Sequence, residues 1–520
     1  MRLYLYIVAR IRERHGFVPL YFCIILPGAV QTTSEVRNME RAPDGAYLGA
    51  ISDENISAIF EGAGDFIRRE LRIKAHTLYI YAIDGLTSGG DISEYVVKPL
   101  MQDAFGGTMR ELYERSLHST VYNSVADPCP DLDTVANKLV NGFCVVLFGE
   151  DAIAFEDKTG EKRSPSAPEV ENTVKGAKDA FTETVRTNTS LLRRHLRSPA
   201  LRLYETKVGR RSLTNVTVAY LDGLTDPELV ERMKARLDRI DIDGLISPAT
   251  VEEYVTGSRP TAFPLLQYTE RADRFAQGLL DGRVGLLVDG LPQGYLAPVD
   301  LGYLMTSAED RGTDYLSATA IRALRYLALL VSLLLPGLYV AMAAFHPEML
   351  PTALLESVIE SKHAVPFPTI FEVLGLLVAF ELLREASISL PQSIGQSLSI
   401  IGGLVVGTAA VEAKIISPAA LIVVAVAGIC GFAVPGRGFA DALRLWRFLL
   451  AVLASLGGLF GLTMGALCLL VHLAGLTSLG ESYLAPFARV SGLRALIRRR
   501  LVNEKYRDAY LHPQDIKNQK

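Results

Sequence analysis

Ionisable side chains interrupt the apolar stretch Pro366–Pro418, and their types and spacing make this stretch the best candidate for chemistry in the chain. It reads PFPTIFEVLGLLVAFELLREASISLPQSIGQSLSIIGGLVVGTAAVEAKIISP. A charge at membrane depth is costly, so it usually faces a protein interior or a water path and marks a functional site. The charged residues inside the apolar runs or at their edges are Glu372, Glu381, Arg384, Glu385, Glu412 and Lys414.

Helix geometry separates these charges. On a helix that turns about 100° per residue, Glu381 and Glu385 lie on nearly the same face, and Glu372 lies on the opposite side. This face predicts two carboxylates beside a water path, with Arg384 as a neighbouring partner. An alternative interpretation puts Arg384 and Glu385 at the membrane interface, where charge costs little, and leaves only Glu381 deep.

Small residues predict a helix break followed by close packing. Pro391 and Gly395 interrupt the helix after these charges, and a broken pair of short helices often builds an ion or substrate site. Gly403 and Gly407 are four residues apart, a spacing that lets helices approach closely in lipid. It leaves open whether the contact lies between subunits or within one subunit. The same spacing recurs at Gly457, Gly461 and Gly465.

Composition divides the 520 residues into two regimes. Residues 40–320 are charged throughout and residues 326–476 are overwhelmingly apolar, which predicts more than one domain. The net charge of −4 gives no reason to propose a nucleic-acid partner. The five cysteines form no CxxC pair, so neither a disulfide framework nor a metal site is expected. We find no phosphate-binding GxxxxGK[ST], no GxSxG and no HExxH motif, and we expect no cofactor and no enzymatic activity.

The charged part predicts two similar α/β subdomains. His76–Leu86 and Asn215–Leu224 are both rich in β-forming residues, and both contain an Asp-Gly pair, at Asp84 and Asp222, before an amphipathic helix. This similarity indicates an internal duplication, and Asp-Gly is first of all turn chemistry rather than a ligand set. The predicted order is a leader or mis-annotated start over 1–50, subdomain 1 over 51–155, a linker over 156–178, and a helix plus subdomain 2 over 179–320.

Two segments of this part have open interpretations. The run before Met39 resembles a signal peptide but is too short to span a membrane, and a translation start at Met39 explains it more simply. A long helix is expected over Asp179–Arg197. Its arginines are suited to binding an anion or a membrane surface, but such a run is more typical of a solvated helix face.

The apolar part, residues 321–487, predicts an α-helical multi-pass membrane domain followed by a basic cytoplasmic tail over 488–520. A crossing helix needs about 20 residues, so the second and third of its five hydrophobic segments are short. The segments are Tyr326–Phe345, Thr369–Leu383, Ser397–Ala413, Ile415–Pro435 and Phe448–Leu476.

Charge placement conflicts with five crossings. Arg322 and Arg325 predict that the soluble domain is cytoplasmic. The acidic loop His346–Pro368 is predicted to lie on the outer side of the membrane. The loop Gly436–Arg447 and the tail are predicted to lie on the cytoplasmic side. If the chain enters the membrane from the cytoplasmic side, five crossings place the tail on the outer side. Either one short segment is re-entrant, or Phe448–Leu476 forms a hairpin at its glycines and gives six passes.

Several motifs, in order along the chain, resemble one known family. The stretch ELLREASISLPQSIGQSLSIIGGLVVGTAAVEAKIISP is similar to the central signature of the A subunits of GerA-type spore germinant receptors. VGRRSLTNVTVAYLDGLTDP, YTERADRFAQGLLDGRVGLLVDGLP and ALRLWRFLLAVLASLGGLFGL also resemble this family, and the resemblance covers about Ile51 to Phe487. Departures are Ala272 where proline is expected, Ser387 where glycine is frequent, and Asp310-Arg311 in a stretch usually read as EDY.

The resemblance implies a multi-pass protein of the spore inner membrane that acts with a transporter-like B subunit and a lipoprotein C subunit. It also implies a homo-oligomeric ring that conducts monovalent ions once the nutrient binds. On that view Glu381, Glu385 and Glu412, with Arg384, are pore or gate candidates. The alternatives are a stage V sporulation AF-type paralogue, which gene neighbours would distinguish, and a secondary transporter, for which no repeat is found.

Overall fold

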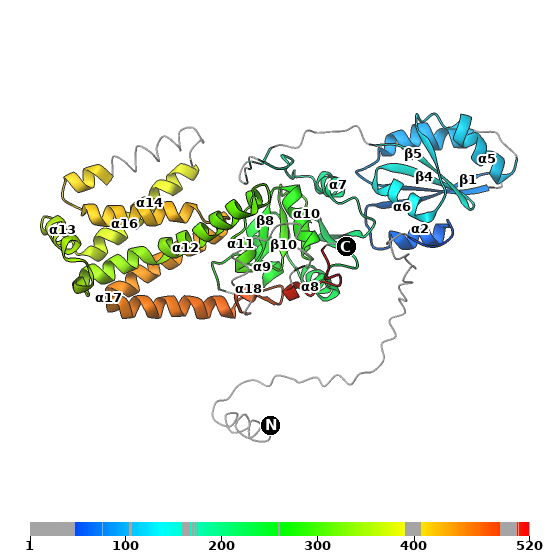
Figure 1. Ribbon diagram of the computed structural model, residues 1–520. Helices are drawn as coiled ribbons and strands as arrows, with labels where there is room; N and C mark the ends of the chain where they lie inside the picture. The colour runs from blue at the N-terminus through cyan, green and yellow to red at the C-terminus, as the bar shows by residue number, and fades with distance from the viewer. Residues whose placement is uncertain are drawn as a thin grey trace, which may run out of the picture. The chain divides into compact units, whose positions relative to one another are not determined.

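The computed structural model describes the compact unit that begins at residue 41. The described residues are 47–74, 76–102, 107–158, 167–168, 171, 173, 175–257, 260–389, 407–488, 507 and 509–518. Met39 and most of the expected leader therefore lie outside the described residues. The strands of the two large sheets come from the blue-to-green part of the chain and the long helices from its green-to-orange part (Figure 1). The expected α/β region followed by a helical region is confirmed.

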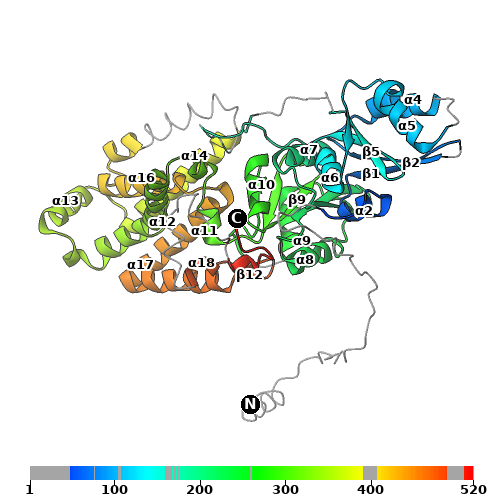
Figure 2. The same cartoon turned by 45° about the vertical axis from the view of Figure 1, so that its right-hand side comes forward.

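The first sheet has five strands in the order β1-β2-β4-β5-β3, and every neighbouring pair is antiparallel. Helices α4 and α5 cover one face, and α2 and α6 cover the other (Figures 1 and 2). The strands are β1 (Phe66–Ile73), β2 (His76–Ile83), β3 (Ala126–Cys129), β4 (Phe143–Phe148) and β5 (Asp151–Glu156). The helices are α2 (Asp53–Ile59), α3 (Gly89–Asp91), the π-helical turn η1 (Ile92–Val97), α4 (Lys98–Gln102), α5 (Met109–Arg115), the π-helical turn η2 (Ser116–Thr120) and α6 (Leu132–Val140).

The second sheet has the order β6-β7-β9-β10-β8, which repeats the first strand for strand, and it too is antiparallel. Its strands are β6 (Leu201–Val208), β7 (Thr214–Leu221), β8 (Gln267–Thr269), β9 (Val284–Val288) and β10 (Gly294–Ala297). Its helices are α7 (Val185–His195), α8 (Pro227–Leu237), α9 (Pro248–Thr256), α10 (Ala272–Leu280), α11 (Leu301–Leu304) and the 3-10 turn η3 (Ala308–Arg311). The same topology is thus built twice.

The two Asp-Gly pairs are turns, as their chemistry predicts. Gly85 and Gly223 have φ of 82° and 73°, in the left-handed region where glycine carries no steric penalty. Asp84 pairs with Arg186 at 3.1 Å, and Asp222 pairs with Arg202 at 2.9 Å. Their carboxylates therefore stabilise the fold through ion pairs.

The arginine-rich helix differs from its prediction. Helix α7 begins at Val185, six residues later than expected, because Ala180 pairs as an extended residue with Arg271. The prediction of a solvated face is wrong for Arg193, which is fully buried and binds both oxygens of Asp65 at 2.8 Å. A buried guanidinium needs such a two-pronged partner to offset its desolvation.

The helical region follows directly from the second sheet. It comprises α12 (Tyr315–Ala344), the 3-10 turn η4 (Pro347–Met349), α13 (Thr352–His363), α14 (Thr369–Ser389), a helical stretch over 407–412, α16 (Pro418–Phe432) and α17 (Arg437–Gly475). Among the described helices, α12 and α17 are long and apolar enough to cross a membrane, and α16 is a shorter apolar helix. Helix α12 lies beside α16 and α17 in both views (Figures 1 and 2). The final elements are β11 (Thr477–Ser478), β12 (Glu481–Ser482), α18 (Ala485–Ala488) and the 3-10 turn η6 (Ala509–Leu511).

Helix α17 is folded back on itself. Its backbone leaves helical geometry at Gly457 and Gly458, and Gly458 has φ of 58° and ψ of −139°. A Cβ on Gly461 would lie 2.0 Å from the carbonyl oxygen of Leu453, eight residues earlier, which a straight helix would hold about 12 Å away. Residues 437–456 and 459–475 are therefore two antiparallel arms. This is the hairpin that the sequence left open as one of two alternatives.

The prediction that Gly436–Arg447 forms a loop is wrong, because helix α17 begins at Arg437. Phe439 on the first arm packs on Phe263 of the α/β region, with ring centroids 5.7 Å apart, and His472 on the second arm contacts the same ring at 6.1 Å. The open ends of the two arms thus share an apolar core with the α/β region.

Candidate functional site

Arginines and carboxylates meet between α14 and the first arm of α17. Glu381 lies 3.6 Å from Arg384, 3.3 Å from Arg444 and 3.6 Å from Arg447. Asp441 accepts a hydrogen bond of 2.8 Å from Arg384 and a further one from Arg444. We call Glu381, Arg384, Asp441, Arg444 and Arg447 the Glu381 cluster.

Three guanidinium groups face two carboxylates in this cluster, so its formal charge is +1. Arg447 is only 5% exposed, and its Nη1 donates to the Ala427 carbonyl oxygen of α16 at 3.5 Å. The Glu381 side chain is 32% exposed, so solvent screening keeps the cost of losing its pair with Arg447 below the roughly 3–5 kcal/mol of a fully buried one. Glu381 therefore fastens α14 to α17, and any change that frees this carboxylate changes how the two helices sit together.

The remaining predicted site residues lie apart from this cluster. Glu385 and Glu412 are exposed, and neither forms an ion pair with any described residue. The arginines of α17 pair with Glu381 on α14, one turn before Glu385. Gly407 packs against the Leu421 side chain of α16, where an added Cβ would lie 3.5 Å away. Pro391, Gly395 and Gly403 lie outside the described residues.

Glu372 is the most deeply buried carboxylate of α14, with 2% of its surface exposed. Its Oε2 accepts a hydrogen bond of 2.7 Å from the backbone N–H of Ser417, the N-cap residue of α16. Its Oε1 and the hydroxyl of Tyr339 are buried without a hydrogen bond to any described residue. The sequence places Glu372 on the side of the helix opposite Glu381 and Glu385 and assigns it no partner, although Ser417-Pro418 is a helix-start signal whose free N–H groups need an acceptor.

The sequence also did not single out Asp441, Arg444 and Arg447 as partners of Glu381. Their positions in an apolar helix start, one turn apart, are a weak signal by themselves. Only the packing of α14 on α17 brings them to Glu381.

Comparison with known proteins decides the family. The profile described as "Bacillus/Clostridium GerA spore germination protein" matches residues 54–510. This chain belongs to the GerA family. Spore germination protein KA of Bacillus subtilis (strain 168) is 35% identical over 435 residues, which cover 82% of this GerA-family chain and 80% of that protein. Spore germination protein A1 of the same organism is 34% identical over 410 residues, covering 78% and 84%.

Two further relatives of this GerA-family chain differ in kind. An uncharacterized membrane protein, YfkQ, of Bacillus subtilis (strain 168) is 36% identical over 443 residues, covering 84% of the chain and 86% of that protein. The crystal structure of the N-terminal domain of the A subunit of the Bacillus megaterium germinant receptor GerK3 is 25% identical. It covers 48% of the chain and 96% of that domain, with a TM-score of 0.37.

The departures of this GerA-family chain from the expected motifs fit their positions. Ala272 is the first residue of α10. Proline is favoured at this helix position, and alanine also fits there without strain. Ser387 donates a hydrogen bond of 2.9 Å to the Leu383 carbonyl oxygen within α14. Asp310 is 3% exposed and binds two arginines of α12.

Proposed function

We propose that this chain is the A subunit of a nutrient germinant receptor in the inner membrane of the bacterial endospore. Support comes from the family match over residues 54–510 and from relatives named as spore germination proteins. In this role it is not an enzyme. It acts with a transporter-like B subunit and a lipoprotein C subunit, and its copies assemble into a ring that conducts monovalent ions.

Six crossings are the topology that this proposal requires. Helix α12 runs from the α/β region to Phe345, beside the turn at Gly458, where an added Cβ would lie 2.9 Å from the Phe345 Cβ. Helix α14 returns to the Glu381 cluster, and Ser417 at the start of α16 lies beside Glu372 near the start of α14. One crossing is therefore assigned, in this proposal, to the hydrophobic segment Ser397–Ala413 that the sequence predicts. Helix α16 then runs to the level of Arg447, and the two arms of α17 add one crossing each.

An even number of crossings removes the conflict in charge placement. The α/β region and the tail then lie on one side of the membrane, together with the arginines near the N-terminal ends of α12 and α17. The acidic segment with Glu348, Glu356 and Glu360 lies on the other side. Because arginines near span ends are retained in the cytoplasm, the α/β region is cytoplasmic in this proposal.

The Glu381 cluster is the proposed gate. The observation that carries this assignment is the pairing of Glu381 with a 5% exposed Arg447. While the carboxylate is neutralised by arginines, the net positive cluster repels a cation and the path stays shut. Freeing Glu381 presents a carboxylate to the ion and loosens α14 from α17.

The test is a flux measurement on Arg447→Gln, which takes from Glu381 its most deeply buried partner and lowers the formal charge of the cluster from +1 to 0. Glu385→Gln, which changes an exposed residue one turn further along α14, is the control. Protein in liposomes is expected to leak potassium roughly tenfold faster for the Arg447 variant, because the freed carboxylate attracts the cation and the contact between α14 and α17 weakens by about 1.4 kcal/mol. The control is expected to leak at the wild-type rate. Equal flux for both variants and wild type would refute the gate.

A further inference from the structure

The segment that leads into α12 is bonded on two sides by arginines. Arg274 of α10 donates through Nη2 to the Thr306 carbonyl oxygen at 3.1 Å. Four residues later Asp310 pairs with Arg325 of α12 at 2.8 Å and with Arg322 at 3.4 Å. Residues 306–310 therefore connect α10 of the α/β region to the third turn of α12.

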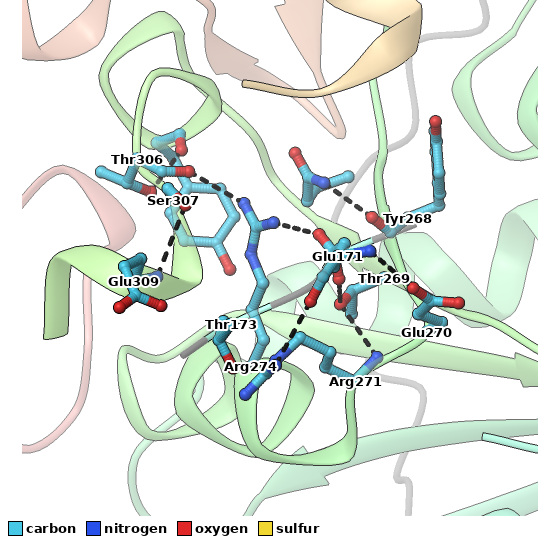
Figure 3. A network of polar contacts seen from close by, with 12 residues as sticks. Glu171, Thr173, Tyr268, Thr269, Glu270, Arg271, Arg274, Thr306, Ser307 and Glu309 are labelled. Carbon is cyan, nitrogen blue, oxygen red and sulfur yellow. Dashed lines mark hydrogen bonds and ion pairs between the residues drawn. The ribbon is translucent and has the colours of Figure 1, made fainter. Parts of the chain in front are cut away.

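The same arginine binds the end of the linker between the two sheets. Glu171 pairs with Arg274 through one carboxylate oxygen and accepts the Thr269 hydroxyl on the other (Figure 3). Its backbone N–H donates to Glu270 at 2.6 Å. The side chains of Glu171 and Arg274 are only 16% and 12% exposed. Arg274 is thus shared between the linker and the segment that leads into α12.

Further contacts fix the linker end at this place. Arg271, which is 1% exposed, donates to the Thr173 hydroxyl at 2.7 Å and to the Glu171 carbonyl oxygen at 3.3 Å. The Lys175 carbonyl oxygen lies 2.9 Å from where a Cβ on Gly312 would sit, directly after η3. The linker end therefore touches both α10 and the residues that precede α12.

We propose that Glu171, Thr173 and Lys175 form a coupling strap, through which a displacement of these residues is transmitted to the N-terminal end of α12. The first link is Glu171–Arg274–Thr306 and the second is Ser307–Asp310–Arg325. Ser307 joins the two, because its backbone N–H donates to Asp310 at 3.2 Å. When Glu171 moves away, the charge of Arg274 stays buried without its carboxylate partner. The Arg274 side chain then changes its position and no longer donates to the Thr306 carbonyl oxygen.

Coupling between two sites is reciprocal, and this property gives the test. Hydrogen–deuterium exchange is measured by mass spectrometry on the full chain in detergent, and the readout does not depend on ion conduction. Glu171→Gln is expected to speed exchange roughly fivefold in peptides covering 306–325, because it removes a charged hydrogen bond from a partly buried partner. Asp310→Asn keeps a capping oxygen for Ser307 but loses the ion pair, and it is expected to speed exchange in peptides covering 171–175.

Matched controls separate coupling from loosening. Glu253→Gln changes an exposed carboxylate of α9, and Asp314→Asn changes a carboxylate that caps α12. Both are expected to leave 171–175 and 306–313 at wild-type rates. Faster exchange confined to 171–175 and 269–274 in the Glu171 variant would overturn the proposal. If that variant does not fold, Thr173→Val is measured instead, with roughly twofold faster exchange at 306–312 expected and an unchanged rate there counting against the strap.

Discussion

Gly461 faces Leu453 across the turn of α17 so closely that a Cβ on the glycine would lie 2.0 Å from the leucine carbonyl oxygen. Real Cβ atoms do not approach backbone oxygen at this distance, so only glycine lets the two arms pack here. Helix-packing glycines spaced by four residues serve this purpose in membrane proteins. The contact therefore lies within one chain, and it leaves the outer faces of the arms for other partners.

Gly461→Ala is expected to push the two arms apart and reduce the amount of folded protein in detergent. Overpacking by one methyl group typically costs about 1–3 kcal/mol, and backbone contacts relax less than side chains. Gly457→Ala is the control, because an added Cβ there meets no atom within 4 Å and its φ is −135°. Size-exclusion chromatography and thermal aggregation measure both variants. Equal behaviour of the two would contradict the hairpin.

Arg193→Ala is expected to destabilise the contact between α7 and the first sheet by about 3–5 kcal/mol, because Asp65 stays buried without its partner. Exchange at 65–73 and 185–195 should rise together in this variant. Arg194→Ala changes the neighbouring, exposed arginine and is expected to leave both segments unchanged. A similar loss of protection in both variants would mean that the ion pair is not what holds α7.

Asp157 gives a pH dependence of its own. Burial, with a smaller effect from Asp91, raises the pKa of its carboxyl to about 6. The folded state then holds a proton that the unfolded state has lost, so stability falls as pH rises from about 4 to 6 and stays low above. Asp157→Asn is expected to stabilise β5 by on the order of 1 kcal/mol at pH 7 and by little at pH 4, measured by exchange at 151–157. Asp151→Asn, at the exposed start of the strand, should show no such difference.

His195 gives a pH dependence of the same sign over a higher pH range. Its hydrogen bond to Asp179, 2.7 Å long, raises the pKa of the imidazole above 6.5. The pair therefore stabilises the end of α7 fully below pH 6.5, and the contribution is lost as pH rises through the raised pKa. Because both side chains are about a quarter exposed, solvent screening limits the effect to less than about 1 kcal/mol. Exchange at 179–195 should be more pH-dependent in wild type than in His195→Gln, and an equal dependence would exclude the pair as its source.

Strands with one or both faces apolar could be predicted from the sequence, whereas strands with charged faces could not. β2 and β7 are rich in β-forming residues with buried side chains, and the sequence predicts both. β1 reads FIRRELRI and is exposed at four successive positions, so its charges conceal its pairing with β2. β6 reads LRLYETKV, fully buries only Leu201, Leu203 and Val208, and was missed for the same reason. The antiparallel order of both sheets followed only from these pairings.

The site was predictable only in its central residue. Glu381 and Arg384 stand out as charges in an apolar run, and they do meet in the structure. Helix geometry put Glu385 on the same face as Glu381. Which turn of this face contacts another helix, however, depends on the position of α17. That position depends on contacts between residues about 60 apart, such as Glu381 with Arg444, and one sequence does not reveal them.

The apolar core shared by the α/β region and α17 constrains the order in which the protein can be completed. Ser478 donates to the Leu265 carbonyl oxygen and accepts the Val299 backbone N–H, across 213 and 179 residues of chain. Tyr483 is fully buried in the same core, beside Phe263. The second sheet can therefore form early in synthesis, but its base stays unfinished until the last arm has been made and returned. A chain that fails to return this arm keeps apolar residues such as Phe263 exposed, which marks it for quality control.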